Sequence, residues 1–129
     1  MRPEDSAYPR DWLGIAEKDL HRVSACLAAG DPELAGFCLQ QAVEKFFKAF
    51  LLHSGWTLRR THDLEALLDD AVTYSPDWEQ YRPVCQRITK FYNLSRYPLL
   101  VASAPAAEEI RESESALQPL LAEIREALG

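Results

Sequence analysis

The chain has 129 residues, a net charge of −6 and a pI near 5.0. This acidity excludes a protein that coats nucleic acid non-specifically, because such binding depends on neutralising phosphates; a local basic patch remains compatible with it. The length suffices for one domain with a sizeable core and is too short for two. We therefore expect a single domain over residues 9–129, preceded by a loose leader at residues 1–8.

The sequence also indicates the cellular compartment of the protein and which kinds of site it lacks. The N-terminus has no apolar core of the signal-peptide type, and no run approaches the roughly 20 apolar residues of a membrane span. Cys26, Cys38 and Cys85 are odd in number and stand in no metal-ligand spacing. Two of them lie in helical patterns, where a free cysteine is usually a small buried hydrophobe. We expect a cytoplasmic protein with no membrane segment, disulfide, metal site or cofactor.

Apolar residues that recur every three or four positions predict the first two helices. The first runs from about residue 9 to residue 29, with Gly30 as its C-terminal cap. The second runs from 34 to 54, and Asp31-Pro32 supplies its N-cap and first-turn proline. The connection is very short, so these helices should be antiparallel neighbours.

Three further helices follow the same pattern. We expect a short one capped by Thr61 that ends near Val72, and a fourth that starts after Ser75-Pro76-Asp77 and ends near Arg96. Pro83 should delay the regular part of the fourth helix.

The fifth helix opens at Pro105, and Pro119 inside it should kink or split it. No strand pattern persists anywhere in the sequence. The predicted fold is an all-α, up-down bundle of four long helices and one short helix.

The second helix carries a polar strip beside its wide apolar stripe. The strip consists of Gln40, Gln41, Glu44, Lys45 and Lys48, and the Glu44–Lys48 pair has a favourable i,i+4 spacing. One interpretation is a solvated face, which is the usual state of charged side chains on a helix and which we favour. The other is a groove that holds phosphate or ribose through Lys45, Lys48 and the amides, with a second helix supplying further groups.

His62 and Asp63 stand at the head of the short helix. A histidine can act as acid or base near neutral pH when a carboxylate orients it. Adjacent helical residues do not face each other, so these two do not form a dyad. We favour a capping role for both residues.

Two groups of cations complete the candidates. Arg96 can complement the C-terminal carbonyls of its helix, pair with Glu44 or a partner's acid, or hold a phosphate bidentately. Tyr92 lies one turn upstream and can offer its hydroxyl to the same cleft or bury its ring. For this pair we favour a structural or interface role. Arg59-Arg60 forms a solvated loop or extends a phosphate-binding patch.

Three segments together resemble the HEPN family (higher eukaryotes and prokaryotes nucleotide-binding domain). They are WLGIAEKDL at 12–20, QQAVEKFFKAFL at 40–51 followed by THDL at 61–64, and YNLSRYP at 92–98. The resemblance implies a small helical bundle that often dimerises. It also implies a minimal nucleotidyltransferase as neighbour or fusion partner and a place among toxin–antitoxin pairs. Many members are metal-independent RNA endonucleases that use an arginine and a histidine four to six residues later.

In this chain Arg96 matches that arginine, and no histidine follows it, so the nuclease motif is incomplete. The leading hypothesis is therefore a homodimeric binding module that acts with a nucleotidyltransferase-type partner and binds nucleotide or RNA. The alternatives are a ribonuclease toxin, in which His62 or Tyr97 replaces the absent histidine, and a dimerisation scaffold. The candidate ligand-facing residues are Gln41, Lys45, Lys48, Tyr92 and Arg96, with Glu44, His62, Asp63 and Tyr97 in support.

Overall fold

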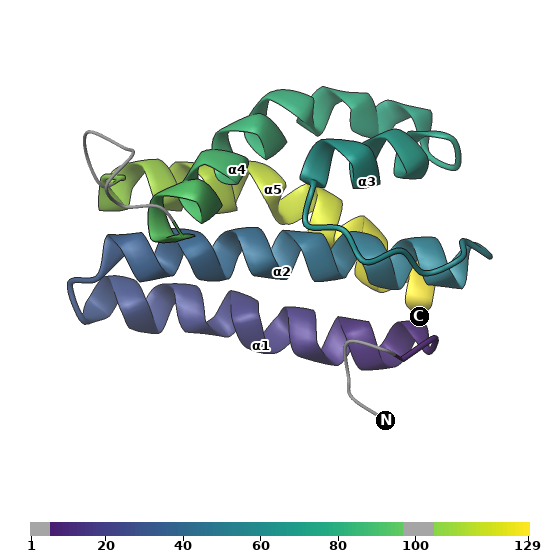
Figure 1. Ribbon diagram of the computed structural model, residues 1–129, viewed down its shortest axis with the longest axis horizontal. Helices are drawn as coiled ribbons and strands as arrows, with labels where there is room; N and C mark the ends of the chain where they lie inside the picture. Colours follow the sequence, from purple (N-terminus) through teal and green to yellow (C-terminus); the bar gives the residue numbers. More distant parts are fainter. Residues whose placement is uncertain (1–5, 97–104) are drawn as a thin grey trace.

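The computed structural model describes residues 6–96 and 105–129, without the side chains of residues 93–96. The α-helices are α1 (Pro9–Ala28), α2 (Pro32–His53), α3 (Leu64–Val72), α4 (Arg82–Arg96) and α5 (Ala107–Leu128), and a 3₁₀ helix, η2 (Pro76–Tyr81), precedes α4. Within the described ranges there is no strand. The predicted all-α bundle of four long helices and one short helix is confirmed (Figure 1).

Helix α2 is the centre of the bundle. Its N-terminus follows the turn at Gly30, whose φ of +76° suits a residue without a side chain, and Asp31 accepts a hydrogen bond from the Leu34 amide at 3.1 Å. Helices α1 and α2 lie side by side along the molecule, as their short connection predicts (Figure 1). Helix α2 contacts each of the other four α-helices, which explains why its apolar stripe is so wide.

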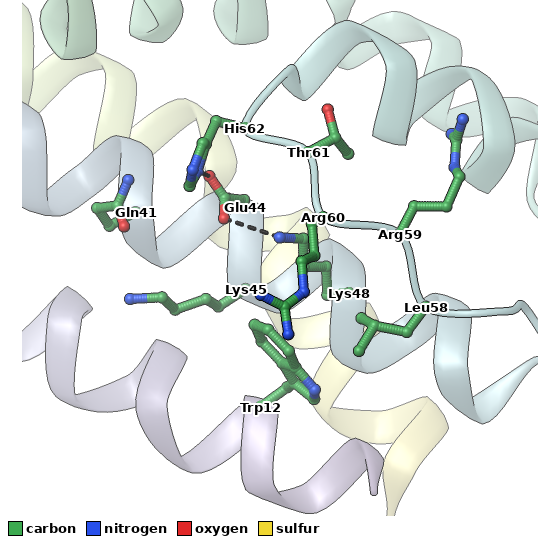
Figure 2. A pocket seen from close by; sticks show the side chains of 10 residues that line it. All are labelled: Trp12, Gln41, Glu44, Lys45, Lys48, Leu58, Arg59, Arg60, Thr61 and His62. Atoms are coloured by element: carbon green, nitrogen blue, oxygen red, sulfur yellow. Dashed lines mark hydrogen bonds and ion pairs between the residues drawn. The ribbon is translucent and has the colours of Figure 1, made fainter. Parts of the chain in front are cut away.

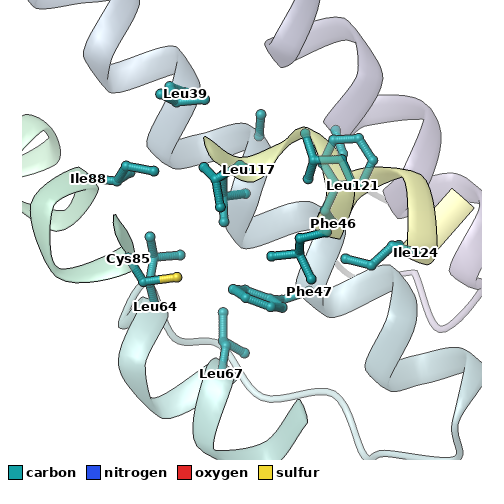
Figure 3. Close-up of a cluster of buried hydrophobic side chains, with 14 of the residues drawn as sticks. Leu39, Phe46, Phe47, Leu64, Leu67, Cys85, Ile88, Leu117, Leu121 and Ile124 are labelled. Atoms are coloured by element: carbon teal, nitrogen blue, oxygen red, sulfur yellow. The ribbon is translucent and has the colours of Figure 1, made fainter. Parts of the chain in front are cut away.

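The core fills the space between α2 and the helices that cover it (Figure 3). Phe46 and Phe47 of α2 are fully buried at its middle. Burial of each large apolar side chain stabilises the fold by about 1.5–3 kcal/mol. The other labelled members of this cluster are Leu39, Leu64, Leu67, Cys85, Ile88, Leu117, Leu121 and Ile124.

Helices α2 and α4 approach closely at Gly36. A Cβ atom at this position would lie 2.9 Å from the Cβ of Phe91, which is closer than side-chain atoms normally come. The absence of a side chain at Gly36 therefore sets how near α4 can lie to the polar strip of α2.

Two predicted helix starts are wrong. Thr61 does not cap α3: its hydroxyl accepts a hydrogen bond from the Asp63 amide in the preceding turn, and Asp63 is the N-cap. Helix α5 begins at Ala107 and not at Pro105. Pro119 lies inside α5 without splitting it. The delay expected from Pro83 is confirmed, because η2 comes first and α4 begins at Arg82.

The described part of the expected leader contacts α1. Ser6 is buried, and its carbonyl accepts a hydrogen bond from Nε1 of Trp12 at 2.7 Å. Its hydroxyl donates to Asp11 at 2.6 Å. These contacts fix the position of Trp12 at the start of the bundle. No helix of the described ranges is both long and apolar enough to cross a bilayer.

Candidate functional site

A cleft of about 290 Å³ opens between α1, α2 and the loop at residues 54–63 (Figure 2). Four cationic side chains and one carboxylate line it, although the whole chain carries a net charge of −6. The lining residues are Trp12 of α1, Gln41, Glu44, Lys45 and Lys48 of α2, and Leu58, Arg59, Arg60, Thr61 and His62 of the loop.

An ion pair forms the floor of this cleft. Nζ of Lys48 donates to Oε2 of Glu44 at 3.0 Å, and the two residues are only 3% and 2% exposed. The interpretation of this strip as a solvated face is therefore wrong, because α1 and the loop cover it. Nζ of Lys48 also lies 5.1 Å from the ring centroid of Trp12, within the range of a cation–π contact.

Gln40 contacts the same Glu44 carboxylate, and Gln41 in turn contacts Gln40. Nε2 of Gln40 lies 3.4 Å from Oε1 of Glu44 and 3.3 Å from the carbonyl of His62. Nε2 of Gln41 donates to Oε1 of Gln40 at 2.7 Å. Gln40 thus ties the loop to α2, and Gln41, which we predicted to face a ligand, reaches the cleft edge half-buried.

His62 completes the environment of Glu44. Its Nδ1 lies 2.9 Å from Oε1 of Glu44, while 62% of its side chain is exposed. Because an ionised carboxylate only accepts hydrogen bonds, Nδ1 carries the proton in this contact. The prediction that His62 caps α3 is wrong. The prediction for Asp63 is confirmed, because its Oδ1 accepts hydrogen bonds from the Glu65 and Ala66 amides at 3.0 and 3.3 Å.

Three rings form a stack that begins at His62. The imidazole lies parallel to the ring of Tyr92, with centroids 5.7 Å apart and an interplanar angle of 21°. Tyr92 stacks in turn on Phe37 at 5.7 Å and 20°. The polar strip of α2 and the C-terminal part of α4 therefore meet through His62.

Lys45 pairs with a residue that the sequence analysis missed. Its Nζ lies 2.5 Å from Oδ2 of Asp19, which is buried and also accepts a hydrogen bond from Arg22 at 2.7 Å. A signal for Asp19 was present. It falls on the apolar face that Trp12 and the other buried residues of α1 define, where an acid needs a partner.

The two consecutive arginines of the loop diverge. Arg59 points out of the cleft (Figure 2), and its guanidinium lies 2.5 Å from Oδ2 of Asp70 on α3. Nε1 of Trp56 donates to the same oxygen at 3.0 Å. Arg60 instead points into the cleft towards Trp12 (Figure 2). The loop is thus fastened to α3 on one side and presents Arg60 on the other.

The model of the HEPN domain matches residues 9–125 of this chain, from the start of α1 to the last turn of α5. The chain belongs to the HEPN family. No curated protein and no solved structure matches it.

In this HEPN domain the residues that line the cleft all lie in the first half of the matched range, and Tyr92 of the second half supports them through its stack with His62. The side chain of Arg96 and the whole of Tyr97 lie outside the described part, so their predicted roles stay predictions. Among the residues that are described, no three His, Cys, Asp or Glu side chains are grouped so as to hold a metal ion. The cleft instead presents amine and guanidinium donors, which suit an anion.

Proposed function

We propose that this HEPN domain is a binding module for nucleotide or RNA, which holds a phosphate group in the cleft between α1, α2 and the loop. The observation that carries the proposal is the gathering of Lys45, Lys48, Arg59 and Arg60 at one cleft of an acidic chain. The amine and guanidinium donors at this cleft attract phosphate locally, although Glu44, Asp19 and Asp70 pair with three of them and the net charge of the molecule is negative.

The four cations have different roles in this proposal. Lys48 is buried against Glu44 and supports the floor, and Arg59 is engaged outside by Asp70. Lys45 and Arg60 reach the cleft and contact the phosphate. Lys45 does so in competition with Asp19, because an anion in the cleft and the Asp19 carboxylate attract the same ammonium group.

We propose further that the module is homodimeric and acts in the cytoplasm with a minimal nucleotidyltransferase-type protein, as a toxin–antitoxin pair. Membership of the HEPN family supports this arrangement. Light scattering of the purified chain measures the dimer, and a pull-down at native expression identifies the partner. A monomer that captures no such protein contradicts this part of the proposal. A dimer that binds neither nucleotide nor RNA would make the chain a dimerisation scaffold.

Calorimetric titration with nucleoside monophosphates tests the phosphate site. Binding should weaken as salt rises, and it should weaken at least several-fold in Lys45→Ala and in Arg60→Ala. The exposed residues Lys90 of α4 and Arg111 of α5 provide matched controls as Lys90→Ala and Arg111→Ala. Equal losses of affinity in the control and cleft variants would show a non-specific charge effect and contradict the assignment of the phosphate site.

A second candidate function rests on the contact between His62 and Glu44. With Nδ1 held by a buried carboxylate, Nε2 of the neutral imidazole is held in a fixed orientation and can accept a proton. In a metal-independent ribonuclease, this nitrogen takes the proton of a ribose 2′-hydroxyl while that oxygen attacks the neighbouring phosphate. The P–O5′ bond breaks, a 2′,3′-cyclic phosphate forms, and the 5′-oxygen leaves with a proton from water. Cleavage of a mixed RNA pool under chelator by wild type, and its loss in His62→Gln, would support this activity; intact RNA with wild type would end it.

A further inference from the structure

The cleft has a second feature besides its charge, which is one exposed ring at its edge. His62 lines the cleft, and Tyr92, on which His62 stacks, does not. One face of the imidazole lies against Tyr92, and the side chain, which lines the cleft, is 62% exposed. Trp12 also lines the cleft, but it is only 2% exposed and its ring is occupied by Lys48. Among the cleft residues, His62 is the ring that can receive a further planar group.

The orientation of His62 is fixed from three sides. Glu44 holds Nδ1, the His62 carbonyl accepts a hydrogen bond from Gln40, and Tyr92 supports the ring from behind. Phe37 extends the stack into the bundle. A planar group that stacks on His62 continues a series of rings that the fold already holds parallel.

We infer that the cleft-facing side of His62 is a stacking site for one nucleobase, whose phosphate lies on Lys45 and Arg60. This inference rests on the proposed phosphate site and adds a site for the nucleobase of the same ligand. A nucleobase stacks on histidine as on other aromatic side chains, and every base offers a π-face, so the site tolerates different bases. The base must be unpaired, because a base inside a duplex has both faces covered.

The size of the cleft suits one nucleotide unit. Its volume of about 290 Å³ falls at the lower end of ligand pockets, which span about 300–1,000 Å³. The unit is either a free nucleotide or one unpaired residue of a single strand. Both present the same base and phosphate to His62, Lys45 and Arg60.

A comparison of nucleoside monophosphates with ribose 5-phosphate tests the inference, because ribose 5-phosphate keeps the sugar and phosphate and lacks the base. On wild type, the monophosphates should bind about 5- to 150-fold more tightly than ribose 5-phosphate, which is the range for one base on one aromatic ring. His62→Ala should abolish this preference and leave ribose 5-phosphate binding nearly unchanged. His62→Phe should retain the preference, since it keeps the ring and loses the contact with Glu44.

The controls separate the two proposals. His21→Ala removes an exposed histidine of α1 and should change neither ligand. Equal binding of monophosphate and ribose 5-phosphate to wild type would overturn the stacking site and leave the phosphate site standing. Binding of neither ligand at millimolar concentration would overturn both. Melting curves of each variant show that it folds, and Tyr92→Leu, which removes the ring behind His62, gives a second route to the same loss of preference.

A single-stranded oligoribonucleotide and a blunt duplex of the same sequence separate the sources of the nucleotide unit. Tighter binding of the single strand than of the monophosphate assigns the site to RNA, and weaker binding assigns it to a free nucleotide. The paired bases of the duplex cannot stack on His62, so the affinity of the duplex should be the same for wild type and His62→Ala. A loss of duplex affinity in His62→Ala would contradict base stacking.

Discussion

Nδ1 of His62 and Oε1 of Glu44 lie 2.9 Å apart, although 18 residues separate them in the chain. Glu44 also accepts a hydrogen bond from Lys48, so one buried carboxylate joins the floor of the cleft to its edge. The Glu44 carboxylate therefore positions both Lys48 and His62, and it can do so without contacting a ligand itself.

The Glu44–Lys48 pair should be sensitive to the loss of either member alone. Lys48→Ala leaves a buried carboxylate with only His62 and Gln40, and Glu44→Ala leaves a buried ammonium; each should lower the free energy of unfolding by about 3–5 kcal/mol. The double variant Glu44→Leu/Lys48→Met should lose much less than the sum. Urea denaturation measures all three, and additive losses would show that the residues do not act as a pair.

Asp19 and Lys45 should have opposite effects on phosphate binding. Lys45→Ala removes a donor and weakens binding. Asp19→Asn removes the carboxylate that competes for the same ammonium, so it should strengthen binding up to about fivefold, the effect of roughly 1 kcal/mol. Asp31→Asn, at the exposed N-cap of α2, is a matched acidic control. Weaker binding in Asp19→Asn would mean that Asp19 orients Lys45 for the ligand.

Two glycines in helices should respond oppositely to alanine. Gly36→Ala places a Cβ 2.9 Å from Phe91 between α2 and α4, so it should destabilise the protein by about 1–3 kcal/mol. Gly14→Ala, on the exposed side of α1 with nothing within 4 Å, should stabilise it by about 0.5–1 kcal/mol. Thermal unfolding of the two variants measures both, and a neutral Gly36→Ala would show that α4 shifts freely.

Alkaline pH should destabilise the protein partly through Cys85. Burial raises the pKa of this thiol from 9.0 to about 12. Above pH 9 the unfolded chain releases the proton while the folded chain keeps it, so stability is complete below pH 9 and falls as pH rises towards 12. The slope is at most about 1.4 kcal/mol per pH unit.

The comparison with Cys85→Ala isolates that contribution. Between pH 9 and about 10.5, wild type should lose stability more steeply than Cys85→Ala in urea titrations. Cys38, whose pKa is raised to about 11 mainly by burial, is present in both proteins, so the difference between their slopes reports Cys85. Parallel slopes for wild type and Cys85→Ala would contradict the raised pKa.

Local signals in the sequence predicted the helices well. Gly30, Asp31 and Asp63 act through their immediate neighbours, so their caps and turns could be read from position alone. Thr61 misled the prediction because it stands two residues before Asp63, and both side chains can cap a helix. Such boundaries depend on which of two similar local hydrogen bonds forms.

The burial of Glu44 and Lys48 could not be predicted in the same way. An i,i+4 pair has the same spacing on a solvated face and beneath a loop, and the cover comes from α1 and from residues distant in the chain. His62 looked like a cap because the partners that position it, Glu44 and Tyr92, lie on other helices. Asp19 alone had a usable signal, as an acid on an apolar face.

The attachment of the loop to Asp70 has a consequence for the thermodynamics of binding. Trp56 and Arg59 both donate to one oxygen of that carboxylate, so the backbone that carries Arg60 and His62 is already ordered before any ligand arrives. Its conformational entropy is lost during folding and does not oppose association. A ligand of this cleft therefore meets a preorganised surface, and its affinity reflects the contacts that it makes.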